Sequence, residues 1–213
     1  MTPSLDAQRL AVLVHEVRSP VAALSAIAEA LDGDTDVETR REFVRLVTLA
    51  CRGVERVVTD AAAASIHSEP IDPEQLVRDV VAGAVVRGAH VELTVVGELP
   101  AIDADPSRLR QALDNLIANA LVHGPADGRV SIRAEAASAA VLISVTDRGP
   151  GIAADELDRI FDVGVRLDPA SRGSGFGLPL ARAIVDGHGG SLTVTSTQGE
   201  GTTFTIALHL RPA

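Results

Sequence analysis

Hydrophobic positions near the N-terminus recur at steps of four and three residues, the spacing of one face of a helix. The first series runs without a slip over residues 10–31, and a second of the same kind covers residues 43–61. Between them lie Gly33, a residue type that commonly ends helices, and Thr35 with Glu38, the spacing of a capping box. The pattern therefore predicts two helices joined by a short turn, an antiparallel hairpin.

An isolated hairpin of this length would leave one apolar stripe exposed to water. A second copy of the chain can cover that stripe, because two hairpins pack into a four-helix bundle with a shared core. We therefore expect a homodimer through the N-terminal hairpin. The alternative is that the hairpin packs on the remainder of its own chain.

The pattern changes beyond "SIHSEPIDPEQ", whose two prolines indicate a domain boundary near residue 68. Beyond it, short apolar or alternating runs typical of strands are interleaved with longer helix-like runs. The strand-like runs are "AHVELTVVG", "GRVSIRAEA", "AVLISVTD", "SLTVTS" and "TTFTIALHL", and the helix-like runs are "PEQLVRDVVAGAVV", "PSRLRQALDNLIANALVH" and "FGLPLARAIVDGH". The sequence thus predicts an α+β protein: a helical hairpin in residues 1–67, dimerising as a four-helix bundle, and an α/β sandwich with one mixed sheet in residues 68–213.

Composition and charge exclude several classes of function. The chain has 213 residues, 46% hydrophobic and 23% charged, which is enough apolar material for a sizeable core. A net charge of −10 without a basic cluster argues against nucleic acid or an anionic membrane as a partner. The single Cys51 excludes an internal disulfide. No apolar run reaches the ~18 residues of a membrane span, and "MTPSLDAQRL" lacks a signal-peptide pattern, so we expect a cytoplasmic protein without direct membrane insertion.

Glycine clusters in the second half suggest a phosphate-binding site. They are "DRGPGI" (147–152), "RGSGFGL" (172–178) and "GEGTTF" (199–204). Backbone N–H groups at a helix N-terminus bind anions, and glycine permits close approach, although an ordinary turn explains any one cluster alone. All 19 basic residues are arginines, which excludes a Walker A loop and a eukaryotic-type protein kinase, since both need lysine. The spacing of Gly173, Gly175 and Gly177 does not fit the dinucleotide motif.

Polar residues in apolar surroundings suggest further site candidates. Asn115 and Asn119 in "LDNLIANALVHG" lie four residues apart, on one face of a predicted helix. Their amide oxygens suit Mg²⁺ that is also bound by phosphates, although an exposed polar face is the ordinary explanation of a lone asparagine. Asp147 ends a strand-like run just before glycines, where it can accept an N–H from a bound base or simply begin a turn.

These residues together resemble the two-component sensor histidine kinases along essentially the whole chain. "HEVRSP" is similar to the H box, "DNLIANA" to the N box, "DRGPGI" to the G1 box and "RIFDVGVR" to the F box. "GSGFGL" resembles the G2 box, and "GEGTTF" the final glycine box. Each motif is moderately specific, whereas their order and spacing are highly specific. The resemblance implies that the second domain is an ATP-binding domain of the GHKL type.

The resemblance also implies a role for each motif residue. His15 would accept the phosphoryl group, and Glu16 would orient or deprotonate its imidazole. Asn119 would hold Mg²⁺, Asn115 would lie near the phosphates, and Asp147 would contact the adenine amino group. The remaining residues that it assigns to ATP binding are Gly149 and Gly151 at the base, Gly173, Gly175 and Gly177 at the lid, and Arg166 and Thr202.

The chemistry of the stretch "LVHEVRSPVAAL" agrees with this assignment. A neutral imidazole is a nucleophile near pH 7, and an adjacent carboxylate favours the tautomer whose free nitrogen attacks. Pro20 cannot donate to the carbonyl of Glu16, so we infer a local bend that lets the hairpin flex; the alternative is that the proline is merely tolerated. A zinc-protease motif is excluded, because Ser19 stands where a second histidine is required.

Several positions depart from the family pattern. Val122 and His123 follow the N box where a basic residue and an aromatic are usual. Gly164 and Val165 replace aromatics of the F box, and Ser19 stands where members with phosphatase activity have Thr or Asn.

The first hypothesis is ATP-dependent autophosphorylation of His15, followed by transfer to an aspartate in the receiver domain of a response regulator. The alternative is a non-catalytic dimeric histidine phosphotransfer adaptor with a degenerate ATP-binding domain, and a third interpretation is an ATP-gated dimerisation module. The H box begins only fifteen residues into the chain. We therefore expect either a fragment of a longer sensor or a signal that arrives through a separate sensor subunit.

Overall fold

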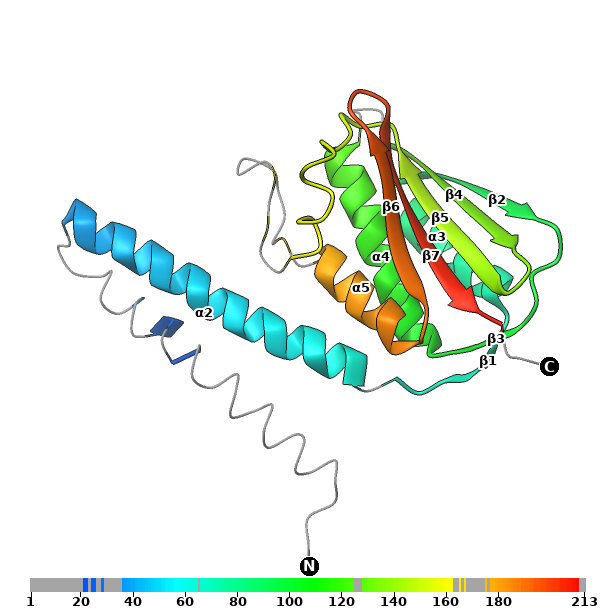
Figure 1. The fold of residues 1–213 in the computed structure, drawn as a ribbon, viewed down its shortest axis with the longest axis horizontal. Helices are drawn as coiled ribbons and strands as arrows, with labels where there is room; N and C mark the ends of the chain where they lie inside the picture. Colours follow the sequence, from blue (N-terminus) through cyan, green and yellow to red (C-terminus); the bar gives the residue numbers. More distant parts are fainter. Residues whose placement is uncertain are drawn as a thin grey trace, which may run out of the picture. The chain divides into compact units, whose positions relative to one another are not determined.

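The chain divides into two compact units, residues 1–61 and 62–213 (Figure 1). The computed structural model describes residues 21–22, 24–25, 28, 36–64, 66–124, 128–162, 165, 167, 175 and 177–210. Four predicted site residues lie outside the described residues: His15, Glu16, Arg166 and Gly173.

Helix α2 (Val37–Ala64) lies in the first unit except for its last three residues. Asp36 caps its start: the Asp36 carbonyl accepts the Arg40 N–H at 3.0 Å, and its carboxylate accepts the Thr39 N–H at 2.7 Å. The capping box predicted from Thr35 is therefore wrong by one residue. Asp and Thr both cap helices well, and the sequence places the two side by side.

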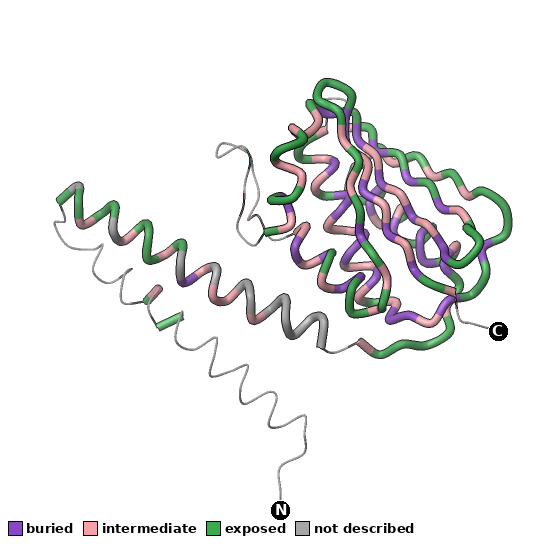
Figure 2. Tube along the Cα trace, in the orientation of Figure 1, coloured by how far each residue is buried: buried purple, intermediate pink, exposed green. Residues whose placement is uncertain are grey.

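The predicted seam of α2 is its less exposed side. Of the seam residues, Ala50 is buried and Phe43, Val47, Val54 and Val57 are half-buried. Val44, by contrast, is 62% exposed. Exposed and half-buried stretches alternate along α2 in Figure 2. Of the preceding predicted helix, residues 21–22, 24–25 and 28 are helical and the remainder lies outside the described residues. The hairpin itself thus stays a prediction.

In its described residues, the second unit combines two sheets with three helices. Its elements are β1 (Glu69–Ile71), α3 (Pro73–Val86), β2 (His90–Val96), β3 (Ile102–Ala104), α4 (Pro106–His123), β4 (Arg129–Ala136), β5 (Ala140–Asp147), α5 (Gly177–Gly187), β6 (Ser191–Thr197) and β7 (Gly201–His209). Five strands form a mixed sheet in the order β2-β4-β5-β7-β6, in which β2 and β4 are parallel and the other neighbours antiparallel. β1 and β3 form a separate antiparallel pair.

The five-stranded sheet has one apolar and one polar face. Ile132, Ile143 and Ile206 alternate with polar residues along their strands and are at most 1% exposed. Helices α3, α4 and α5 pack on this apolar face (Figure 1). On the opposite face, Thr146 and Thr203 lie in register on β5 and β7, with their hydroxyls 2.9 Å apart. The alternation explains why a period of two was visible in the sequence.

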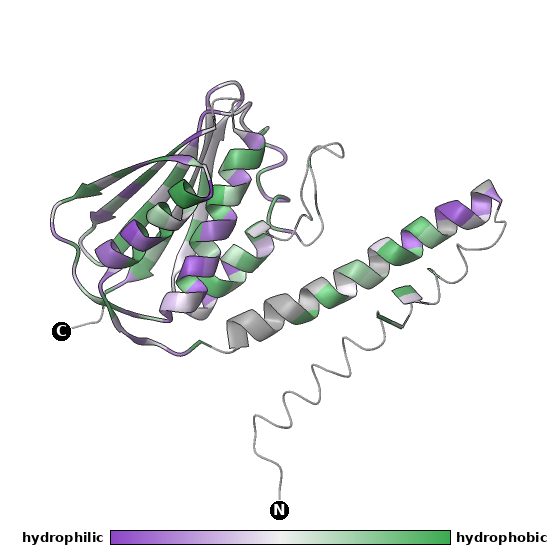
Figure 3. Cartoon of the chain, turned by 180° about the vertical axis from the view of Figure 1, so that it is seen from behind, coloured by the Kyte–Doolittle hydropathy of each residue, from purple (hydrophilic) through white to green (hydrophobic). Residues whose placement is uncertain are grey.

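Each helix has a buried apolar side that fixes it on the sheet. In α4 the residues Leu109, Leu113, Leu116 and Ile117 are at most 2% exposed, and bands of hydrophobic and hydrophilic residues alternate along this helix in Figure 3. These residues, together with Phe204 of β7, belong to one continuous core. Burying such side chains contributes on the order of 1.5–3 kcal/mol each to folding.

The predicted α/β sandwich is confirmed in the second unit, with all its predicted helices and strands present. The prediction lacked β1 and β3, which have only three residues each. No helix among the described residues combines the length and apolarity needed to cross a membrane.

Candidate functional site

A buried carboxylate marks the end of the central strand β5. Asp147 is 3% exposed, and its Oδ1 accepts the Gly149 N–H at 2.7 Å. Burial raises the pKa of Asp147, while the N–H groups of Gly149 and Thr202 and the nearby His123 act in the opposite direction. A buried carboxylate carries a desolvation cost, which is typical of a group kept for binding.

Three chain segments approach so closely beside Asp147 that side chains would collide. A Cβ added to Gly149 would lie 2.3 Å from the carbonyl oxygen of His123, the last residue of α4. Gly201 has a φ of +112°, and a Cβ there would lie 2.1 Å from the carbonyl oxygen of Asp147. Glycine is therefore required where the end of α4, the loop after β5 and the start of β7 meet.

The loop after β5 is fastened to the β6–β7 hairpin through Ser196. The hydroxyl of Ser196 accepts the Ile152 N–H at 2.9 Å and donates to the Gly201 carbonyl at 2.8 Å. It also lies 2.9 Å from the hydroxyl of Thr202, which is 5% exposed. A Cβ on Gly151 would meet the Thr197 carbonyl oxygen at 2.1 Å, so the loop lies directly against the hairpin.

Sequence reasoning missed Ser196. A serine in a strand is common, and nothing in the local pattern indicates its distant partners.

The side chain of Asn115 faces the start of α5. A Cβ on Gly177, the first residue of α5, would lie 3.7 Å from the Asn115 Oδ1. The Nδ2 of Asn115 is buried and has no hydrogen-bond partner in the described part of the chain. Such a group normally costs about 1–3 kcal/mol, so its presence indicates a missing acceptor.

Asn119 lies one turn further along α4 and is half-buried, as is Gly175 just before α5. The two asparagines therefore share one side of α4, as their spacing predicted. Nowhere in the described ranges do three or more His, Cys, Asp or Glu side chains gather into a metal site.

The segment around Phe161, which follows the loop after β5, is held by aromatic contacts. Phe161 packs edge-on against Phe204, with ring centroids 6.3 Å apart at 86°. The guanidinium carbon of Arg182 on α5 lies 4.0 Å from the centre of the Phe161 ring. Stacking of this kind contributes about 0.5–1 kcal/mol at an exposed position. Phe161 thus ties its segment to both the core and α5.

The structure brings together most of the predicted site. Asp147, Gly149, Gly151 and Thr202 meet at the joined ends of β5 and β7, and Asn115 faces Gly177 at the start of α5. The site thus offers an acceptor for a polar N–H at one end and helix N–H groups for an anion at the other.

The sequence profile of the histidine kinase-, DNA gyrase B- and HSP90-like ATPases matches residues 104–212, about half of the chain and all the described residues of this site. The chain belongs to this ATPase family. Asp147, Asn115 and Asn119 lie within the matched residues.

Sensor histidine kinases match nearly the whole chain. The adaptive-response sensory kinase SasA of Synechococcus elongatus is 34% identical over 92% of this chain and 57% of SasA. The sensor-like histidine kinase SenX3 of Mycobacterium tuberculosis is 34% identical over 91% of this chain and 51% of SenX3. The solved structure of full-length ShkA in complex with AMPPNP has a TM-score of 0.66 and 28% identity, covering 97% of this chain and 47% of ShkA.

The chain spans about half the length of the curated relatives it matches. The matched share of this chain exceeds the ATPase domain and so includes part of the N-terminal unit. The resemblance to two-component sensor histidine kinases is thereby confirmed.

Proposed function

We propose that the chain is an ATP-dependent protein-histidine kinase of a two-component system. The proposal rests on two buried groups of the ATPase domain: one is a hydrogen-bond acceptor, and the other is a donor without an acceptor in the described part of the chain. Asp147 is buried at one end of the site, and the Nδ2 of Asn115, near the start of α5, is buried without a hydrogen-bond partner among the residues that the structure describes. An adenine amino group satisfies the first, and a phosphate oxygen satisfies the second.

The residues of the site fit ATP by charge and shape. Asp147 accepts the exocyclic N–H of adenine, and Gly149 and Gly151 keep the loop beside it free of side chains. The N-terminus of α5 at Gly177, with Gly175 before it, offers backbone N–H groups to the phosphates. We assign Gly173, Arg166 and Thr202 to the same site by family resemblance. The Thr202 hydroxyl also supports the loop through Ser196.

Asn119 is the proposed protein ligand of Mg²⁺. Its amide oxygen is a hard, neutral donor, and in the described ranges no cluster of acidic or histidine side chains competes for the ion. When bound, Mg²⁺ would neutralise negative charge on the phosphate oxygens.

His15 is the proposed nucleophile of the reaction. A nitrogen of its neutral imidazole forms a bond to the γ-phosphorus, the bond from that phosphorus to the oxygen shared with the β-phosphate breaks, and ADP leaves. Glu16 orients the ring or takes its proton. A receiver-domain aspartate then takes the phosphoryl group, the bond from phosphorus to the ring nitrogen breaks, and a proton lost from the ring returns, which regenerates neutral His15.

We further propose an assembly consistent with this chemistry. The hairpin, within residues 1–67, pairs with a second copy to form a four-helix bundle, because the seam of α2 is apolar along its length. Residues 68–213 carry ATP. The partners are a response regulator and, as the source of the signal, a sensor segment or subunit.

Incubation with Mg²⁺ and γ-labelled ATP tests the function. The intact chain is expected to acquire acid-labile, alkali-stable label, which His15→Gln abolishes and Asn119→Ala reduces at least tenfold. His209→Gln, at an exposed end of β7, and Gln111→Ala, elsewhere on α4, are matched controls that keep full labelling.

Nucleotide binding without label under any condition would contradict kinase activity of this chain. Label that instead arrives only from another phosphoprotein would favour the phosphotransfer adaptor.

A further inference from the structure

Two helices of the ATPase domain begin with the same dipeptide but in different surroundings. Asp72–Pro73 opens α3 and Asp105–Pro106 opens α4. The exposed Asp72 is an ordinary cap: its Oδ1 accepts the N–H groups of Glu74 at 2.9 Å and Gln75 at 3.2 Å. Asp105, by contrast, is 7% exposed. A buried carboxylate needs more partners than a helix start supplies.

The two oxygens of Asp105 have different partners. Oδ1 caps α4, accepting the Ser107 N–H at 3.0 Å, the Ser107 hydroxyl at 2.7 Å and the Arg108 N–H at 3.0 Å. Oδ2 accepts the N–H of His67 at 3.1 Å. Residues 66–68 lie in the second unit and connect α2 to β1, so this bond joins the connection after α2 to the start of α4.

The peptide N–H of Asp105 is held by a histidine at the end of α5. It donates to Nε2 of His188 at 2.9 Å, while Nδ1 of the same ring bonds the Ile184 carbonyl at 2.7 Å. These partners require a neutral ring with its proton on Nδ1. The connection, the start of α4 and the end of α5 therefore meet at Asp105.

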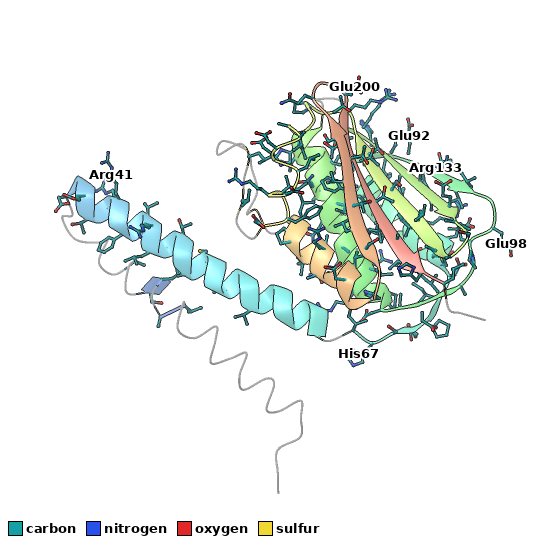
Figure 4. All side chains as sticks on the ribbon, viewed as in Figure 1. Arg41, His67, Glu92, Glu98, Arg133 and Glu200 are labelled. Atoms are coloured by element: carbon teal, nitrogen blue, oxygen red, sulfur yellow. The ribbon has the colours of Figure 1, made fainter. Side chains whose placement is uncertain are left out.

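The junction at Asp105, where residues 66–68, the start of α4 and the end of α5 meet, is remote from the proposed nucleotide site. The helices α4 and α5 contribute to both. α4 (Pro106–His123) begins next to Asp105 and ends beside Asp147, and α5 (Gly177–Gly187) ends next to His188. Figure 4 shows His67 and Glu200, the latter in the β6–β7 turn, at opposite ends of the ATPase domain. The same rigid elements thus end at the site on one side and at the junction on the other.

We propose that Asp105 is a positioning residue that anchors residues 66–68 to the ATPase domain and so fixes the length of free chain between ATP and the phosphoacceptor hairpin. This role rests on the proposed kinase function. A tether that becomes longer than the span it must bridge lowers the effective concentration of one unit around the other, and so slows a reaction between them without changing nucleotide affinity.

Asp105→Asn in the full chain removes the hydrogen bond from the His67 N–H and keeps the cap at the start of α4. Three donors face Oδ1, so the amide oxygen of asparagine takes that place, and asparagine caps helices as well as aspartate does. Its NH₂ group then faces the N–H of His67, where two donors cannot bond. Asp72→Asn is the matched control, because it changes the same atoms in an exposed cap without this partner.

Three measurements are compared in both variants: amide exchange at His67 by NMR, ADP affinity, and the autophosphorylation rate at saturating ATP. For Asp105→Asn we expect at least tenfold faster exchange at His67, a Kd for ADP within twofold of the parent, and at least threefold slower autophosphorylation. Asp72→Asn is expected to keep all three within twofold.

If Asp105→Asn leaves amide exchange at His67 unchanged, Asp105 does not anchor this segment. If amide exchange becomes faster but the autophosphorylation rate stays the same or increases, Asp105 is not a positioning residue. If the parent chain acquires no label, the kinase function fails, whereas the exchange and affinity measurements still decide whether Asp105 anchors the connection.

Discussion

At the scale of single residues, the site depends on a carboxylate held where its charge is costly. Burial raises the pKa of Asp147 against the opposing effects of Gly149, Thr202 and His123. The proposed contact with the adenine amino group favours the ionised form, because a carboxylate accepts an N–H more strongly than a protonated carboxyl group does. We therefore expect ADP affinity to fall as the pH is lowered through this raised pKa, above the range near 4 where an ordinary aspartate titrates.

Folding stability responds to the same proton with the opposite sign. Because the folded-state pKa of Asp147 lies above its unfolded value, the native state binds more protons, and this group makes the free energy of unfolding rise as the pH falls through that range. Calorimetric titrations with ADP at several pH values, beside urea unfolding of the free chain, measure both trends. An Asp147→Asn chain that retained the full pH dependence of ADP affinity would contradict the assignment.

Some residues of the site and of the junction at Asp105 could be predicted from the sequence and others could not, for a physical reason. Asp147, Gly149 and Asn115 were predictable because a polar residue in an apolar run, or glycines after a strand, violate the local pattern. Ser196 and the second oxygen of Asp105 were not predictable. Their local environments are ordinary, and their importance comes from partners 44 and 38 residues away.

At the scale of helices and strands, the hydrophobic periodicity of a segment determined whether it could be predicted from the sequence. The run "AVLISVTD" matches β5 to the residue, since its eight residues combine an apolar run with an alternating one, both typical of a strand. β1 and β3 have three residues each, too few to display a period, and they exist because they pair with one another. Their pairing brings residues 66–68 beside the start of α4, so the least predictable strands position the junction.

His188 tests how firmly α5 is joined to α4. Replacing it by leucine leaves the Asp105 N–H without its acceptor, and an unsatisfied buried donor costs about 1–3 kcal/mol. His188→Gln keeps an acceptor oxygen and should lose less than half as much. Urea unfolding of the full chains gives both values.

An exposed histidine supplies the control for this comparison. His209→Leu is expected to change the free energy of unfolding by no more than about 0.5 kcal/mol. Equal losses for His188→Leu and His188→Gln would mean that ring packing, not the hydrogen bond, joins the two helices.

At the scale of the whole molecule, the two units depend on different sources of stability. The ATPase domain has a continuous core that extends from α3 to β7. In α2, Ala50 is the one seam residue that the structure describes as buried, and Val44 and Leu46 are 62% and 40% exposed. A helix with so little covered surface needs a partner to be stable in water. In the proposed dimer that partner is the second copy.

Thermal unfolding of the full chain should therefore show two transitions with different dependences. Unfolding of the proposed bundle separates two chains, so the transition of the first unit should rise in temperature with protein concentration. ADP with Mg²⁺ binds only the folded ATPase domain, so at 100 times its Kd it should stabilise the second transition by about 2.7 kcal/mol and leave the first in place. Scanning calorimetry at several concentrations, with and without ADP, resolves the two. A single transition that moved with both variables would mean that the units unfold together and that the hairpin draws its stability from its own ATPase domain.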